Sequence, residues 1–300
     1  MIEFELPDLG MWIFVVPLTA IGCFLLWPHS RQRRQKWAEQ WARQNLVRLT
    51  PEINDAVVTN ATITGRVAGV AAILVAAIEA AMTLTSPDGD IPTPQLWTLV
   101  ISFGALLTGV GVWRLQSPWL RPSATRAAHL RSTRLSDYVP PSLRWSARTA
   151  AALCLAAAVG VALLDPASVT TTAGLSTLIP AGIVVAAAIM AEWSGRIAAA
   201  HPQPARDAVE LYAQDAWRAG IARQGFQGVA MWGGLVLGFT GTQIPGHAQL
   251  VGTITQLIGL SLMIGATLTT AALPPIEWTR KRLWPSLGPG EWVSAQAVTL

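Results

Sequence analysis

The sequence has little charge and few of the residues from which active sites are built. Only 13% of its 300 residues are charged, well below the share usual in soluble domains. Its two cysteines and four histidines do not cluster, so we expect neither disulfides nor a zinc site. It contains no GxxxxGK[ST] or HExxH motif and no GxSxG elbow with suitable partners. We therefore expect no metal, no other cofactor and no enzymatic activity.

Long apolar blocks are what the sequence does have, and 52% of its residues are hydrophobic. A helix needs about 20 apolar residues to cross a bilayer, and these blocks lack the strict alternation of barrel strands. The sequence thus predicts an all-α polytopic membrane protein. The fourth block is short and the sixth is rich in glycine, so we expect six or seven spans. The predicted spans cover residues 11–27, 67–85, 96–113, 149–164, 175–193, 226–244 and 250–273.

The basic residues occur in alternate connections between these blocks. The 21 Lys and Arg are divided 7, 7, 4 and 3 among segments 28–66, 114–148, 194–225 and 274–300. The other connections, 1–10, 86–95, 165–174 and 245–249, contain none. This asymmetry predicts a cell-membrane protein with its N-terminus outside and its C-terminus in the cytoplasm. It also accounts for the net charge of +4 without a nucleic-acid partner. Abundant alanine and only two lysines indicate a bacterial source.

Tryptophans mark the predicted cytoplasmic boundary. Trp27, Trp113, Trp193 and Trp278 each follow or close an odd-numbered span, and an arginine comes within four residues of each. Anchoring at the membrane interface explains these residues by itself. Their spacings of 86, 80 and 85 residues also favour a repeat in which three helical hairpins follow a single first helix.

Two cytoplasmic segments have helical periodicity. In 31–49, apolar residues share one side and basic residues occupy the rest, as expected of a helix lying on an anionic inner leaflet. Segment 204–222 has an apolar side as well. We interpret both as interfacial helices, and a docking surface for a soluble partner is the alternative.

A polar site within the membrane is predicted around Glu79. This carboxyl lies about 18 Å into its span by helical rise, on the same side as a row of alanines that favours close helix packing. Thr255 and Gln256 of the last span can line a polar pathway or hydrogen-bond to Glu79. The alternative is a neutral, hydrogen-bonded Glu79 with a structural role. Glu192, in contrast, is explained by an ion pair with Arg196 four residues later.

Smaller patterns predict packing. Gly234 and Gly238 form a GxxxG pair, as do Gly65 and Gly69, and such pairs are typical of close helix contacts. Both cysteines, Cys23 and Cys154, fall in spans, where we expect them to be buried. The segment 134–144 resembles a motif, but its residues suggest no chemistry.

These features support several functions. The leading hypothesis is a permease-like or accessory subunit of a transport complex that relies on a cytoplasmic ATPase or another soluble partner. The first alternative is a small proton- or cation-coupled transporter that uses Glu79. The second is a membrane scaffold or regulatory protein that recruits a cytoplasmic partner. A lipid-modifying enzyme is the weakest hypothesis, because the loops hold no acid–base or metal constellation. Homo-oligomers are compatible with all of them.

Overall fold

The computed structural model describes eight stretches of the chain and is almost entirely α-helical within them. No β-strand occurs among these residues, which are 9–26, 31–85, 133–164, 172–200, 205–244, 248–272, 275–288 and 290–293. The helices are α1 (Leu9–Leu26), α2 (Arg31–Asn45), α3 (Pro51–Thr85), α5 (Leu135–Tyr138), α6 (Pro141–Leu164), α7 (Thr172–Ala200), α8 (Ala208–Thr242), α9 (Gln249–Ala272) and α10 (Pro275–Leu283). The predicted all-α fold is confirmed.

Within the described stretches, three helices are long and apolar enough to span a membrane. They are Pro141–Leu164, Thr177–Ala200 and Gln249–Leu268, and they correspond to the fourth, fifth and seventh predicted spans. Helices α1, α3 and α8 cover three more predicted spans, whose crossing of the membrane stays a prediction. The remaining predicted span, 96–113, lies outside the described residues. The total of seven spans and the hairpin repeat therefore also stay predictions.

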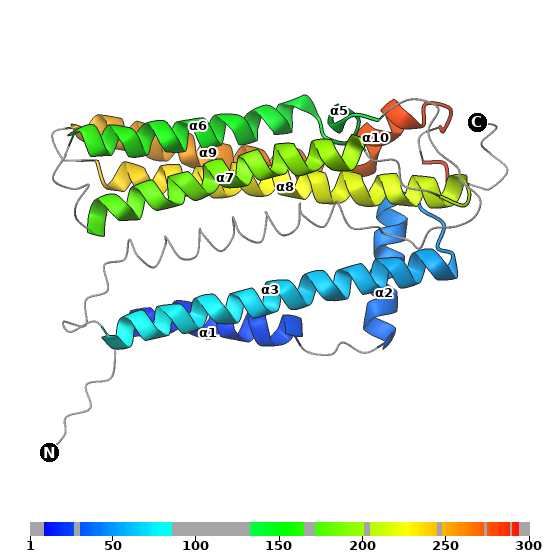
Figure 1. Cartoon of the computed structure of the whole chain (residues 1–300), viewed down its shortest axis with the longest axis horizontal. Coiled ribbons are helices and arrows are strands. Elements are labelled where there is room, and N and C mark those ends of the chain that lie inside the picture. The colour runs from blue at the N-terminus through cyan, green and yellow to red at the C-terminus, as the bar shows by residue number, and fades with distance from the viewer. Residues whose placement is uncertain are drawn as a thin grey trace, which may run out of the picture.

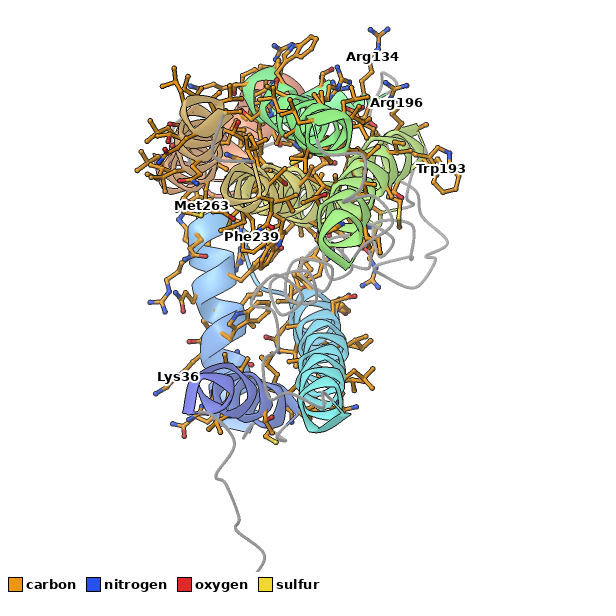
Figure 2. All side chains as sticks on the ribbon, turned by 90° about the vertical axis from the view of Figure 1, so that its left-hand side faces the viewer. Lys36, Arg134, Trp193, Arg196, Phe239 and Met263 are labelled. Carbon is orange, nitrogen blue, oxygen red and sulfur yellow. The ribbon has the colours of Figure 1, made fainter. Side chains whose placement is uncertain are left out.

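The long helices run roughly parallel to one axis of the molecule. Helices α6 to α9 lie side by side and alternate in direction, and α1 packs along α3 below them in this view (Figure 1). Helix α2 runs across this axis in both views (Figures 1 and 2). Because the helices alternate, α2, α5 and α10 gather at one end of the molecule, and the C-terminal ends of α3, α6 and α8 lie at the other (Figure 1). This arrangement agrees with the predicted segregation of charge.

Alanine dominates the core between α6, α7 and α8. Ala147, Ala151, Cys154 and Ala158 are buried at intervals of three or four residues along α6, and such small side chains let helices approach closely. The Cys154 thiol donates a hydrogen bond to the carbonyl oxygen of Gly233 at 2.9 Å. The predicted burial is thus confirmed for Cys154 and wrong for Cys23, which is exposed because α1 packs against α3 through Gly22 and Leu25.

The outer surface of the bundle is apolar. Helix α9 exposes leucines and isoleucines along its length, including Leu250, Ile254, Leu257 and Leu268. An apolar surface of this extent on a soluble protein would mark an interface. On a helix of membrane-spanning length, such a surface suits contact with lipid.

Helices α3 and α8 are longer than a bilayer requires. Each has 35 residues, or roughly 52 Å, which exceeds the hydrocarbon thickness by about 20 Å. Local signals set their starts: the Thr50 hydroxyl accepts a bond from the amide of Ile53, and the Asp207 carboxylate accepts one from the amide of Glu210. The predicted interfacial helix 204–222 is therefore corrected to the first half of α8, which continues into the predicted sixth span.

The projecting ends of these helices pack into a second core, which we call the end layer. It comprises α2, residues 46–58, residues 205–217, α10 and the described residues of 284–293. Its core unites residues from all five parts, among them Ala38, Val57, Tyr212, Ile276 and Trp284. Trp41 and Trp217 meet edge to face with ring centroids 5.9 Å apart. The apolar side of α2 thus contacts protein.

Candidate functional site

The structure places the three residues of the predicted polar site on two helices with different neighbours. Glu79 belongs to α3, which packs against α1 and α2, and its side chain lies outside the described residues. Thr255 and Gln256 belong to α9, which packs against α8 and α6. The Thr255 hydroxyl donates to the carbonyl oxygen of Val251 at 2.8 Å, and Gln256 is exposed. A joint site with Glu79 stays a prediction.

The predicted tryptophan anchors have different surroundings. Trp193 is 62% exposed and projects from the side of the bundle, as does Arg196 (Figure 2). Trp278 is half-buried, and its indole N–H donates to the carbonyl oxygen of Ser136 at 2.9 Å. Trp27 and Trp113 lie outside the described residues. Only Trp193 therefore has, among the described anchors, the open exposure that suits contact with lipid headgroups.

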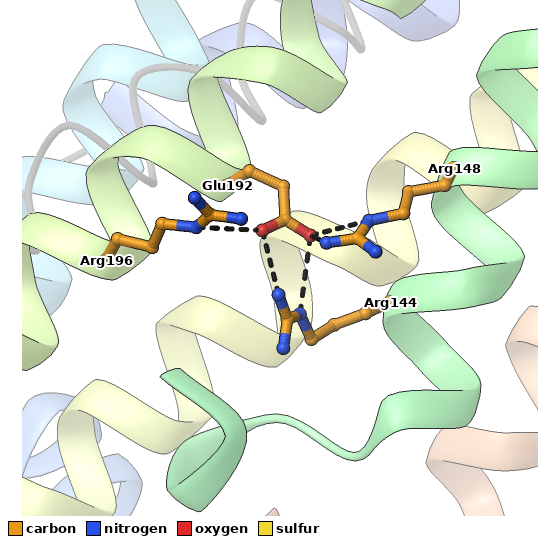
Figure 3. A network of polar contacts seen from close by, with 4 residues as sticks. All are labelled: Arg144, Arg148, Glu192 and Arg196. Atoms are coloured by element: carbon orange, nitrogen blue, oxygen red, sulfur yellow. Dashed lines mark hydrogen bonds and ion pairs between the residues drawn. The ribbon is translucent and has the colours of Figure 1, made fainter. Parts of the chain in front are cut away.

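A cluster of three arginines surrounds Glu192 on α7 (Figure 3). Arg144 of α6 donates to both Glu192 oxygens, through Nε at 3.3 Å and Nη2 at 2.9 Å. Arg148, one turn later, donates to Oε1 through Nε at 2.9 Å and Nη2 at 2.7 Å. Arg196 adds a weaker ion pair at 3.5 Å. The expected pair of Glu192 with Arg196 is present, but the arginines of α6 make the shorter contacts.

This cluster lies at one end of an apolar groove between α6 and α7. The groove has a volume of about 460 Å³ and is lined by Arg148, Ala151, Ala152, Leu155, Val185, Ala188, Ile189, Glu192, Trp193 and Arg196. Along both helices, the lining residues farther from the cluster are all apolar. A second tryptophan, Trp145, is 63% exposed, and the Arg148 guanidinium lies 5.2 Å from its ring centroid. The groove is thus cationic at its end-layer side and apolar toward the middle of the helices.

A buried carboxylate, Asp215, joins three parts of the chain. It accepts hydrogen bonds from the hydroxyl of Tyr138 and from the indole N–H of Trp284, both at 2.9 Å. Tyr138 lies in the motif-like segment 134–144, and Trp284 follows α10. The nearby Tyr212 hydroxyl donates to the carbonyl oxygen of Asn45 at 3.1 Å. The motif-like segment therefore has a structural role, which is to fasten α5 and the chain after α10 to α8.

Burial dominates the ionisation of the two tyrosines in this network. Burial raises the pKa of Tyr138, and the negative charge of Asp215 raises it further. Burial raises the pKa of Tyr212 to about 12, although the Arg280 guanidinium acts in the opposite direction. Both hydroxyl groups therefore remain protonated hydrogen-bond donors at physiological pH.

The exposed side of α2 and its C-terminal turn is strongly cationic. Arg33, Arg34, Lys36, Arg43 and Arg48 are exposed, and Lys36 projects away from the neighbouring helices (Figure 2). The helix ends at Asn45, and the φ of 54° at Leu46 turns the chain so that the Val47 amide can donate to the carbonyl oxygen of Ala42. Because the apolar side of α2 is packed against protein, the cationic side is what it presents to its surroundings.

Sequence reasoning missed the contacts between helices. Arg144 and Arg148 are spaced to share one side of a helix, as are Glu192 and Arg196, so each pair was visible. That the two pairs meet depends on how α6 packs against α7. The burial of Asp215 could have been predicted from the sequence, because this residue lies three residues after Tyr212 on the apolar side of segment 204–222. An acid in such a position predicts a buried hydrogen-bonding role.

The chain matches no protein-family model, no curated protein and no solved structure. Within the part of the chain that the structure describes, no group of three or more His, Cys, Asp or Glu residues could hold a metal ion. The function is therefore inferred from the geometry of the end layer and of the Glu192 cluster.

Proposed function

We propose that the chain is an accessory or permease-like membrane subunit of a larger transport complex, and that its end layer holds a soluble partner at the cytoplasmic surface. The observation that carries this proposal is the packing of the end layer. Three stretches that are distant in the sequence, 31–58, 205–217 and 275–293, form one buried core there, and Asp215 ties that core to α5. A rigid layer beside the helix bundle is what a docking subunit needs in order to present a fixed surface.

The partner we propose is a soluble protein with an acidic surface. The cationic side of α2 favours such a partner by charge complementarity, which accelerates association and orients the two proteins. A cytoplasmic ATPase fits this role, because the sequence has no P-loop of its own with which to supply energy. A scaffold that recruits a different acidic partner would use the same surface.

The test is purification of the full chain from its native host in a mild detergent through a C-terminal tag. We expect one soluble protein to co-purify in a fixed stoichiometry. The double variant Arg34→Glu with Lys36→Glu reverses two exposed charges of α2 and should abolish this association. The variant should still insert in the membrane, because neither side chain belongs to the buried core.

A matched control reverses two charges on α10, another part of the same layer. The variant Lys281→Glu with Arg282→Glu changes the net charge equally and should retain the partner if α2 is the docking surface. In both preparations the co-purified protein is identified and its nucleotide-hydrolysis activity is assayed. These two measurements establish whether it is an ATPase. A chain that purifies alone, or a partner that survives the α2 reversal, would contradict the proposal.

A further inference from the structure

We propose that the groove between α6 and α7 binds an anionic phospholipid, with the phosphate at the arginine cluster and an acyl chain along the apolar lining. This inference does not depend on the proposed accessory role. It rests on an imbalance of charge at one end of the groove and on the apolar character of the rest.

The charge imbalance comes from three guanidinium groups that share one carboxylate. Arg144, Arg148 and Arg196 carry three positive charges, and Glu192 supplies a single negative charge. Each guanidinium has five N–H donors, whereas a carboxylate offers about four acceptor positions. Glu192 therefore cannot satisfy the cluster, and the excess charge favours a further anion with several oxygens. Phosphate fits this requirement, because guanidinium groups bind it through paired hydrogen bonds.

The exposure of the arginines shows from which side the anion arrives. The side chain of Arg144 is 19% exposed, that of Arg148 is 37% exposed and that of Arg196 is 67% exposed. Arg144 is thus the inner member that holds Glu192, and the other two border the groove. We assign Arg148 and Arg196 to the phosphate and Arg144 to the positioning of Glu192.

The remainder of the groove selects a lipid over a free phosphate ion. The lining of α6 beyond Arg148 consists of Ala151, Ala152 and Leu155, and α7 contributes further apolar side chains over a similar depth. From Arg148 to Leu155 the rise is about 10 Å, enough to hold several methylene groups. Exposed Trp145 and Trp193 flank the cluster, and tryptophan is enriched at the level of lipid headgroups. Basic pockets between membrane helices on the cytoplasmic side are known sites for phosphorylated headgroups.

Native mass spectrometry of the full chain in a neutral detergent tests the site. The probes are phosphatidylglycerol and phosphatidylcholine with identical acyl chains, supplied together, and inorganic phosphate as a competitor. We expect the amount of bound phosphatidylglycerol to exceed that of bound phosphatidylcholine by roughly tenfold. This difference corresponds to one or two charge-assisted contacts. We expect inorganic phosphate at the same concentration to leave it bound.

Two arginine variants locate the site. Arg148→Gln combined with Arg196→Gln should remove the preference for phosphatidylglycerol, and Arg196→Gln alone should reduce it without loss of folding because that side chain is largely exposed. Arg34→Gln with Lys36→Gln removes the same charge from α2 and should leave the preference intact. An unchanged preference in both arginine variants would overturn the proposal, as would its loss in the α2 control alone.

A third variant separates a lipid from a soluble anion. Ala152→Phe fills the groove beside Leu155 and leaves the arginines in place. We expect it to weaken phosphatidylglycerol binding about as much as the double arginine variant does. Displacement of the lipid by inorganic phosphate, together with normal lipid binding by Ala152→Phe, would show that the cluster is an anion site without an acyl groove and would overturn the proposal.

Discussion

Gly234 of α8 lies directly against Gly259 of α9, so that a Cβ atom at position 234 would be 2.5 Å from the carbonyl oxygen of Gly259. Two turns further along α8, Gly241 and Gly252 are in equally close contact, and a Cβ on either would be 2.7 Å from the carbonyl oxygen of the other. The two backbones therefore touch along this antiparallel pair. The prediction that Gly234 mediates helix packing is confirmed.

This contact predicts different effects for two alanine substitutions within one GxxxG motif. Gly234→Ala should lower the unfolding free energy by about 1–3 kcal/mol, because the new methyl group overpacks a backbone that cannot move aside. Gly238→Ala is the control, because its Cβ would meet no atom within 4 Å. Unfolding midpoints in a mild detergent measure both. Equal midpoints for the two variants would contradict the close approach of α8 and α9.

Removal of the Asp215 carboxylate should loosen the end of the chain. Asp215→Ala leaves the Tyr138 hydroxyl and the Trp284 indole without their buried acceptor, at a cost of roughly 1–3 kcal/mol for each. We expect faster proteolytic cleavage within 284–293, which limited proteolysis with mass-spectrometric mapping would detect. Asp55→Ala removes an exposed carboxylate from α3 and should leave the cleavage rate unchanged. Equal cleavage rates in the two variants would show that Asp215 does not fasten residues 284–293.

The tyrosines predict an alkaline transition. Tyr138 and Tyr212 are the two tyrosines of the chain, and burial raises the pKa of both above the ordinary value, to about 12 for Tyr212. The unfolded chain therefore loses these protons at lower pH than the folded protein does. The contribution of these two groups to the unfolding free energy should be constant below about pH 10 and fall as the pH rises from about 10 toward 12.

Tyrosinate absorbance in the near ultraviolet, followed together with helical circular dichroism, measures this transition. We expect little tyrosinate while the helices remain folded, and its appearance together with unfolding. Tyr212→Phe should reduce the dependence of stability on alkaline pH. Full ionisation of both tyrosines near pH 10 in a folded protein would show that the two hydroxyl groups are accessible to solvent.

The members of the Glu192 cluster should differ in their effects on stability. Glu192→Ala leaves three arginines without their shared acceptor and should cost about 1–3 kcal/mol. Arg196→Ala removes one exposed contact at 3.5 Å and should cost ~0–1 kcal/mol. Unfolding midpoints in detergent distinguish the two variants. A larger loss of stability for Arg196→Ala than for Glu192→Ala would mean that the ion pair of Glu192 with Arg196 dominates the cluster, as the sequence alone suggests.

The sequence predicted the features that depend on composition and periodicity. The helical fold, three helices of membrane-spanning length and the packing role of Gly234 follow from apolar blocks and short spacings, because a helix converts spacing directly into position. The interfacial interpretation of 204–222 was wrong because helical periodicity does not reveal where a helix stops. No residue between that segment and 226–242 interrupts the helix, and α8 continues from Ala208 to Thr242.

The sequence could not reveal contacts that depend on the arrangement of helices in space. Arg144 and Glu192 are 48 residues apart, and Tyr138 and Asp215 are 77 residues apart. Each pair meets because two helices pack in a particular register, which is decided by many small side chains together. For the same reason, the apolar side of α2 suggested contact with lipid, whereas it packs against α3 and α8 in the end layer.

We expect the helix bundle to span the membrane with its cationic end layer in the cytoplasm. Cysteine accessibility tests it most directly, in a Cys23→Ser background that removes the exposed native thiol. Thr242→Cys lies at the end of α8 far from the end layer, and Lys281→Cys lies on α10; both positions are exposed. A membrane-impermeant maleimide should label position 242 in intact cells, and position 281 only in inverted vesicles. Labelling of position 281 in intact cells, or of both positions from one side, would contradict the claim.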